Sequence, residues 1–296
     1  MTQATAAEPL AASVLAGKRA ARARWAKYFF RSPVALVSLA FVALMVILAV
    51  GAHWIAPYDP LAQNVRERLE GPSWAHPFGT DAIGRDVLSR MVYGTRVSLV
   101  AALGAVSLSV AVGVSLGLLS GYAGGLLDEV IMRLVDSIVA FPAIILALAF
   151  VTAFGASLSS VIIALAVVSI PLYARLMRAQ VMAVKESDFV LAARSSGANP
   201  LRVVGRHILP NVMSPIIVAA TLGMSYAILA EASLSFLGAG VQPPTPTWGG
   251  MLNDAARYIH TNTYMTIFPG AAIFALVLSL NFLGDTLQDA VDPRSK

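Results

Sequence analysis

Between two long apolar segments lies the stretch DFVLAARSSGANPLRVVGRHILPN, residues Asp188–Asn211, which we call the elbow. Its pattern predicts a first helix that ends at a glycine C-cap, Gly197, and a second helix with Asn199 as N-cap and Pro200 as first residue. Pro210 is expected to end the second helix and lead into the next apolar segment. The apolar side of that helix is expected to contain Leu201, Val204 and Ile208. A basic, amphipathic helix-turn-helix between two apolar segments predicts a water-exposed connection at a membrane surface, covered by anionic lipid or by a partner protein.

The composition is that of a membrane protein. Hydrophobic residues make up 57% of the 296 residues and charged residues 12%, and the mean hydropathy is +0.74. Soluble proteins have about 25% charged residues, so we expect one all-α integral membrane domain. The formal charge of +5 does not indicate nucleic-acid binding, because the basic residues flank apolar segments, where anionic lipid attracts them. The chain has no cysteine and its four histidines are scattered, so neither a catalytic thiol nor a metal site is predicted.

Six apolar segments reach the length of about 20 residues that a membrane-spanning helix needs. The expected spans are Val34–Ile55, Val97–Gly121, Leu134–Phe154, Leu158–Met177, Val212–Leu237 and Met265–Leu287. Only Gly155–Ser157 separates the third span from the fourth, which predicts a tight helical hairpin. Pro142 and Pro171 can kink these two spans.

Lys and Arg are distributed unevenly among the segments that join the spans. They gather in the tail 1–32 and in the loop 178–211, which predicts that both termini and this loop are cytoplasmic. The first apolar run is longer than that of a signal peptide and follows a long tail, so an uncleaved anchor is expected. The expected organisation is a cytoplasmic tail (1–32) and a transmembrane domain (33–296), with its first span at 34–55, an external loop at 56–96 and core spans at 97–287.

The elbow resembles the cytoplasmic loop signature of ABC importer permeases, E-A-A-x-x-x-G-x(9)-I-x-L-P. The matching residues are Ala192, Ala193, Gly197, Leu209 and Pro210. Leu191 stands in the Glu position and His207 in the Ile position, with Ile208 one place later. The form RHILPN is similar to the peptide-importer branch. Two further stretches resemble the second permease subunit of dipeptide and oligopeptide importers, namely HPFGTDAIGRDVLSRMVYGTRVSL (76–99) and EASLSFLGAGVQPPTPTWGGML (231–252).

This resemblance implies a type I ABC importer permease that forms half of a path for di- or oligopeptides in a bacterial inner membrane. It implies four kinds of partner: a homologous second permease, two ABC ATPase subunits, an extracytoplasmic substrate-binding protein and the lipid bilayer. The elbow would dock into the ATPase through a coupling helix. The residues expected to couple are Ala192, Ala193, Gly197, Ala198, Asn199, Leu201, Arg202, Arg206, Leu209 and Pro210. Because the chain lacks the G-x-x-x-x-G-K-[ST] sequence, ATP and Mg are expected in the ATPase subunits and no cofactor in this chain.

Two polar residues within apolar segments are candidates for the translocation path, Glu231 and Asn281. An acid at the centre of a span costs about 2.5–3.5 kcal/mol on insertion scales, so Glu231 should face a partner or water. The alternative is a hydrated, structural position near a helix end. A self-contained ion-coupled transporter is the rival function, but it predicts repeats and paired mid-membrane charges, and only Glu231 fits that pattern.

Gly113, Gly117 and Gly121 recur every four residues in the second span, which predicts a flat helix face that packs closely against another helix. The first two also complete a G-x-S-x-G sequence around Ser115. A hydrolase is not expected, because that motif needs a strand-to-helix turn. No catalytic residues are predicted.

Overall fold

The computed structural model describes residues 32–291, and its named elements are all helices. The basic tail predicted at 1–32 thus lies, except for its last residue, outside the described residues. The helices are α2 (Pro33–Val50), α3 (Ala52–Ile55), η1 (Val65–Glu67), α4 (Val87–Ala123), α5 (Gly125–Val139), α6 (Ala143–Phe154), α7 (Leu158–Val184), α8 (Asp188–Ser195), α9 (Pro200–Arg202), η2 (Val203–Ile208), α10 (Leu209–Phe236), α11 (Trp248–Ala256) and α12 (Tyr264–Val291). The all-α membrane fold predicted from the sequence is confirmed.

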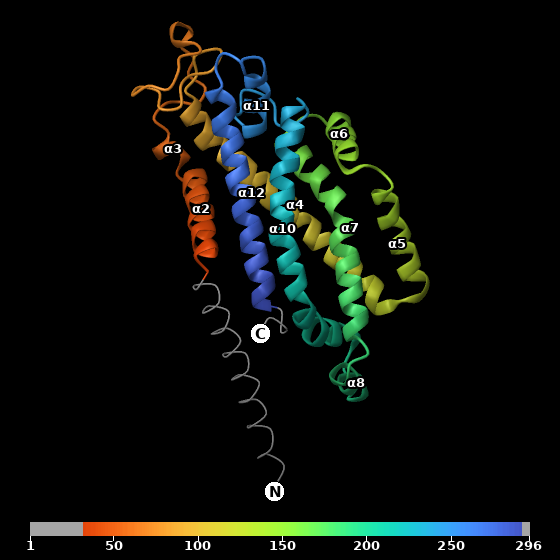
Figure 1. Cartoon of the computed structure of the whole chain (residues 1–296). Helices are drawn as coiled ribbons and strands as arrows, with labels where there is room; N and C mark the ends of the chain where they lie inside the picture. Colours follow the sequence, from red (N-terminus) through yellow and green to blue (C-terminus); the bar gives the residue numbers. More distant parts are fainter. Residues whose placement is uncertain (1–31, 292–296) are drawn as a thin grey trace.

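The long helices form a bundle whose two ends differ (Figure 1). Helices α10 and α12 pack against each other, α4 packs against α7, and α2 packs against α12 at one flank. At one end lie the elbow, the start of α2 and the end of α12. At the other end lie the loop between α3 and α4 and the segment that carries α11. The elbow and the two ends of the described chain are therefore on the same side of the bundle.

Helix α4 begins ten residues earlier than the predicted second span, at Val87 instead of Val97. Asp86 caps it, since its carboxylate accepts a hydrogen bond from the Ser89 backbone N–H at 2.7 Å. The first turns contain arginines and are too polar for the hydropathy pattern to include them. The predicted external loop (56–96) is correspondingly shorter, and its last part is helix.

The predicted third span is not one helix. Helices α5 and α6 are separated by a break at Ala140–Pro142 and bend by 88°. Pro142 has no backbone N–H and restricts the residue before it, so a helix cannot pass through this point unchanged. The sequence suggested a kink here, but the structure shows a break. In the described residues five helices are long and apolar enough to span a membrane, and a sixth span exists only if the bent pair counts as one.

The core lies where α4, α7, α10 and α12 meet. Its largest fully buried side chains include Tyr173 and Met177 of α7, Ile228 of α10 and Leu276 of α12. Pro171 lies inside α7 and does not interrupt it. A smaller cluster beside α6 contains Val151. These contacts hold the bundle that carries the elbow at one end.

Candidate functional site

The elbow begins with α8 and a tight turn of the Schellman type. Gly197 has φ of 77°, a left-handed conformation that residues with a Cβ rarely adopt. The Gly197 N–H donates to the Arg194 oxygen at 2.9 Å, and the Ala198 N–H donates to the Ala193 oxygen at 3.1 Å. Two of the carbonyls that the helix end leaves free are thereby satisfied. The predicted glycine turn is thus formed as its local sequence requires.

The second helix of the elbow starts as predicted but does not stop as predicted. The Asn199 side-chain oxygen accepts a hydrogen bond from the Leu201 N–H at 2.9 Å, and Pro200 is the first helical residue. The chain then continues through the π-helical turn η2 directly into α10. Pro210 therefore lies at the start of α10 and does not end a helix, which corrects the sequence-based expectation.

The π-helical turn η2 allows the helix to continue through Pro210. Because Pro210 has no N–H, it cannot make the usual hydrogen bond to the preceding turn. The Leu209 N–H instead reaches back to the Val204 oxygen. The Asn211 side chain donates to the His207 carbonyl oxygen at 2.6 Å, which satisfies a carbonyl group in the widened turn. The segment RHILPN thus joins the elbow to α10 without a loop.

The elbow is anchored on one side and open on the other. Val190, Val203 and Ile208 are fully buried against the bundle. Leu201 was expected on this apolar side but is 81% exposed, so it points away from the bundle. Among the other predicted coupling residues, Ala193, Ala198 and Leu209 are half-buried, and exposed positions are held by Ala192, Gly197, Asn199, Arg202, Arg206 and Pro210. Most of the predicted set is therefore accessible to a partner.

Two cationic side chains, Lys185 at the end of α7 and Arg194 of the elbow, contact the last turns of α4. The Lys185 ammonium donates to the Gly121 carbonyl oxygen at 3.1 Å. The Arg194 guanidinium lies 5.1 Å from the centre of the Tyr122 ring, a cation–π contact. Neither contact was expected from the sequence, because the partners are far apart in the chain.

The glycines of α4 that recur every four residues, Gly113, Gly117 and Gly121, face α7. A Cβ added at Gly117 would lie 2.3 Å from the Ala174 carbonyl oxygen, and one at Gly113 would lie 2.7 Å from the Tyr173 Cβ. At Gly121 the nearest atom, the Arg178 oxygen, would be at 2.9 Å. The absence of side chains at these positions lets the two backbones approach closely. Ser115 lies within the continuous helix α4, away from any strand-to-helix turn.

Glu231 is fully buried within the bundle. Its carboxylate accepts hydrogen bonds from the Ser235 hydroxyl at 2.8 Å and the Ser98 hydroxyl at 3.1 Å. It thus joins α10 to α4 near the end of α10 at Phe236. The hydration expected in the alternative is wrong, but its structural position near a helix end agrees with these contacts. Asn281 is half-buried on α12 and is not brought near Glu231 by any described contact.

At the end opposite the elbow, charged residues from two distant segments form what we call the outer clamp, consisting of Asp81, Arg85, Arg90 and Asp254. The Arg85 Nε lies 2.6 Å from the Asp81 carboxylate, and the Arg90 Nε lies 3.5 Å from it. Both arginines also approach Asp254, at 3.6 and 3.9 Å. Beside the clamp, Trp248 donates its indole N–H to the Met91 oxygen at 3.0 Å. The sequence did not predict these residues as a group, although they fall in or next to the two stretches that carried the resemblance.

The same stretch contains a buried histidine. His76 Nδ1 lies 2.8 Å from Asp86, and Nε2 lies 3.4 Å from Glu67. Burial lowers the pKa of His76, but the hydrogen bonds and charges of Asp86 and Glu67 outweigh this effect and raise the pKa above its ordinary value. The ring therefore links the external loop to the cap of α4.

Comparison with known families gives this arrangement its context. Residues 113–296 match the family described as the binding-protein-dependent transport system inner membrane component. The chain belongs to this family. Residues 22–72 of the permease match a second model, the N-terminal transmembrane domain of oligopeptide transport permease C.

Named relatives of the permease span nearly its whole length. It is 44% identical over 275 residues to the dipeptide transport system permease protein DppC of Haemophilus influenzae, covering 91% of this chain and 93% of the relative. It is 43% identical over 282 residues to the glutathione transport system permease protein GsiD of Pectobacterium atrosepticum, covering 94% of each. The predicted membership of the ABC importer permeases is therefore confirmed and is favoured over a self-contained ion-coupled transporter.

The fold is also that of a solved transporter. An inward-facing structure of the MetNI methionine ABC transporter superimposes with a TM-score of 0.59 at 20% identity, over 69% of this chain and 98% of that chain. A second crystal form gives 0.55 at 21% identity. At this identity the likeness concerns the fold alone.

Proposed function

We propose that this permease forms one half of the membrane path of an ATP-driven importer for di- and oligopeptides. Its partners would be a homologous second permease, two ATPase subunits that hold ATP and Mg, and an external substrate-binding protein. The substrate class rests on relatives that are named for dipeptide and glutathione transport, since glutathione is itself a short peptide. The family description supports the dependence on a binding protein. The chain itself would bind no cofactor and catalyse no reaction.

The observation that carries the proposal is the form of the elbow. Its buried residues fix it to the bundle, while Leu201 and the arginines beside it remain exposed. Exposed leucine next to cationic side chains is suited to a partner protein with an apolar groove and acidic rim. The elbow also runs without a loop into α10, so a force on it reaches the membrane bundle directly.

The proposed orientation places the elbow and both termini in the cytoplasm of a bacterial cell, with the outer clamp on the external side. Its basis is the excess of Lys and Arg in the tail and in the loop 178–211. The ATPase subunits would then lie below the elbow, and the substrate-binding protein would meet the opposite end. Closure of the ATPases on ATP would shift the elbow and tilt α10, and the reverse motion would follow hydrolysis.

The test is substitution of Gly197 in the complete transporter. Gly197→Val puts a β-branched residue where φ is 77°, which costs about 1–2 kcal/mol and shifts the turn equilibrium by roughly 5- to 30-fold. No atom lies within 4 Å of an added Cβ, so the effect is conformational and not a clash. Gly197→Asn is the matched control, because asparagine tolerates this conformation.

The variants are to be compared in proteoliposomes by uptake of a labelled dipeptide and by ATP hydrolysis. We expect Gly197→Val to retain ATP hydrolysis but to lose most uptake, and Gly197→Asn to retain both. Equal uptake by the two variants would contradict a coupling role for the elbow. Uptake that does not depend on ATP but is driven by an ion gradient would contradict the importer proposal as a whole.

A further inference from the structure

The break between α5 and α6 leaves polar backbone groups on the surface of the bundle. The first turn of α6 has no side-chain cap, and its first internal bond joins the Leu146 N–H to the Pro142 oxygen at 3.0 Å. The residues at the break are exposed, Phe141 by 59%. In hydrocarbon such groups have no hydrogen-bonding partner, so irregular backbone is tolerated at membrane depth only inside protein or beside water.

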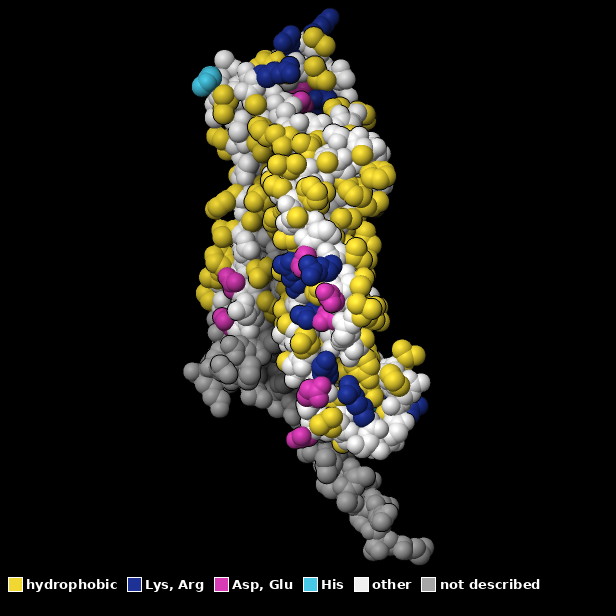
Figure 2. All heavy atoms as spheres, turned by 90° about the vertical axis from the view of Figure 1, so that its right-hand side faces the viewer, with side chains coloured by type: hydrophobic (Ala, Val, Ile, Leu, Met, Phe, Trp, Pro, Cys, Tyr) yellow, Lys and Arg dark blue, Asp and Glu magenta, His cyan; other side chains and the backbone are white. Residues whose placement is uncertain are grey.

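A charged face of α5 leads up to this break. Glu129, Arg133, Asp136 and Ala140 follow at spacings of four, three and four residues and so share one side of the helix. Arg133 pairs with Glu129 at 3.7 Å. Figure 2 shows the flank on which α5 and α6 lie, where charged side chains gather below a broad hydrophobic area.

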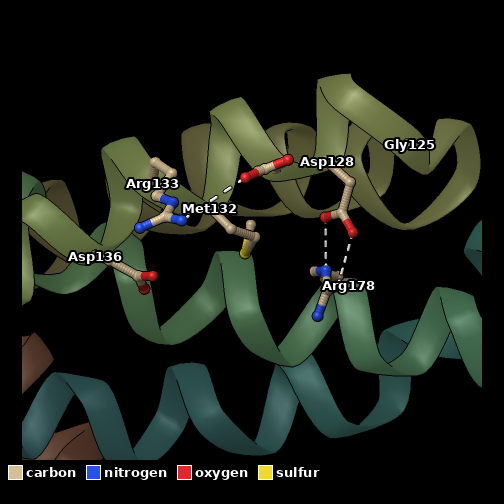
Figure 3. A pocket seen from close by; sticks show the side chains of 7 residues that line it. Gly125, Asp128, Met132, Arg133, Asp136 and Arg178 are labelled. Carbon is tan, nitrogen blue, oxygen red and sulfur yellow. Dashed lines mark hydrogen bonds and ion pairs between the residues drawn. The ribbon is translucent and has the colours of Figure 1, made fainter.

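Helix α7 provides the opposing charges. The Asp128 carboxylate receives two hydrogen bonds from the Arg178 guanidinium, at 2.6 and 2.7 Å, and Asp136 receives one from Arg175 at 2.6 Å. Together with Gly125 and Met132, residues of this group enclose an open cavity of about 270 Å³ (Figure 3). The ion pairs remain open to the surroundings, since the side chains of Asp136 and Arg175 are 57% and 50% exposed.

The depth of the charged face follows from α7. From Leu158, where α7 begins at the end opposite the elbow, Arg175 lies roughly 26 Å along the helix at about 1.5 Å per residue. The hydrocarbon of a bilayer is about 30 Å thick. If α7 enters the hydrocarbon at Leu158, the pair of Arg175 with Asp136 lies about 4 Å inside the boundary on the elbow side. Because α5 runs from the elbow side toward the opposite end, the break at Ala140 lies deeper still.

From these observations we infer that the α5–α6 face lines the water-filled translocation path rather than contacting lipid. Lipid would leave the ionised side chains and the break without solvent. A dry protein contact would bury several charges that are already paired with each other and would gain no new partners. Water satisfies both the charges and the backbone.

The inference rests on the proposed function, and it deepens that proposal by naming the face of this chain that borders the path. The second permease would lie across the water and would not pack directly on this face. The half-open ion pairs would then meet a passing substrate with ionised amino and carboxyl groups. A short peptide carries both groups.

The experiment uses thiol accessibility, for which the chain is well suited because it has no cysteine. Ala140→Cys places a thiol on the charged face at the break. Ala43→Cys is the matched control, since Ala43 is exposed in the middle of the apolar helix α2. Ala75→Cys in the external loop is the water-exposed reference. The complete transporter, nucleotide-free and in nanodiscs, is treated with a sulfonated maleimide, and labelling of this chain is followed by mass spectrometry.

We expect Ala140→Cys to label at a rate near that of Ala75→Cys and at least roughly tenfold faster than Ala43→Cys, because a thiol in apolar surroundings rarely ionises. Labelling of Ala140→Cys at the slow rate of Ala43→Cys would overturn the inference, whether lipid or protein covers the site. ATP-driven uptake by the same preparations separates the two proposals. Uptake with slow labelling refutes only the placement of the path, whereas absent uptake in the cysteine-free parent refutes the proposed function.

Discussion

The close contact between α4 and α7 makes Gly117 the position at which the smallest substitution should have the largest effect. Gly117→Ala adds one Cβ, which would lie 2.3 Å from the Ala174 carbonyl oxygen and 2.8 Å from the Met177 Cβ. Carbon atoms in ordinary contact are about 3.5–4.0 Å apart, so the two helices must separate locally by about 1 Å. Such a separation forfeits part of the packing energy along the whole contact.

Overpacking of this kind costs about 1–3 kcal/mol. For a protein of this size, 1 kcal/mol corresponds to about 2–4 °C in the midpoint of thermal unfolding, so a fall of roughly 2–12 °C is expected. The measurement is the loss of helical circular dichroism on heating the purified permease in detergent. Gly113→Ala and Gly121→Ala should have smaller effects, since their nearest atoms lie at 2.7 and 2.9 Å.

Gly270→Ala is the control for this series. Gly270 also lies inside a membrane helix, α12, but an added Cβ would meet no atom within 4 Å. The substitution should leave the midpoint unchanged or raise it slightly, because alanine favours helix over glycine. If Gly117→Ala and Gly270→Ala melted at the same temperature, close packing at the glycine face would not be the reason for these glycines.

Two further predictions concern buried ionisable groups. Glu231→Ala should destabilise the permease by about 3 kcal/mol in the same melting assay, because it leaves a cavity and removes the acceptor of the Ser98 and Ser235 hydroxyls. Glu231→Gln should recover most of this loss. An unchanged melting temperature for Glu231→Ala would show that the two serines bond elsewhere. The raised pKa of His76 means that its bond to Asp86 contributes fully below the unfolded pKa of about 6.5 and is lost as pH rises through the higher folded pKa. Limited proteolysis of the loop 56–86 should therefore quicken at alkaline pH in the wild type, and this dependence should disappear in His76→Gln; cleavage that quickens equally in both would rule out His76 as its source.

Local signals in the sequence predicted the elements that depend on local physics. The turn at Gly197 and the cap at Asn199 follow from the conformations that these residues favour, and both are present. The apolar segments predicted α2, α7, α10 and α12, because a run of about 20 apolar residues is typical of a membrane-spanning helix. The start of α4 was missed because Arg90 is polar. Its burial depends on ion pairs with Asp81 and with Asp254, and Asp254 lies far away in the sequence.

The same limit applies to features that depend on how the helices are arranged in space. Hydropathy does not show in which direction a helix axis runs, so it could not distinguish a kink at Pro142 from the observed break. The bond between Glu231 and Ser98 could not be predicted, because Ser98 lies in another helix and cannot be recognised by spacing. The place of Glu231 in the translocation path stays a prediction. The sequence also gave no sign of the ion pairs between α5 and α7, which depend on how the two helices lie together.

The helix that begins at Pro200 continues to Phe236 without an intervening loop, a length of roughly 54 Å at about 1.5 Å per residue. One continuous helix therefore extends from the elbow to the end of the bundle where the outer clamp lies. Linkage requires that two binding events that bias the same helix influence each other equally. If docking of the substrate-binding protein at the outer end raises the affinity of the elbow for the ATPase, docking of the ATPase must raise the affinity for the binding protein by the same factor.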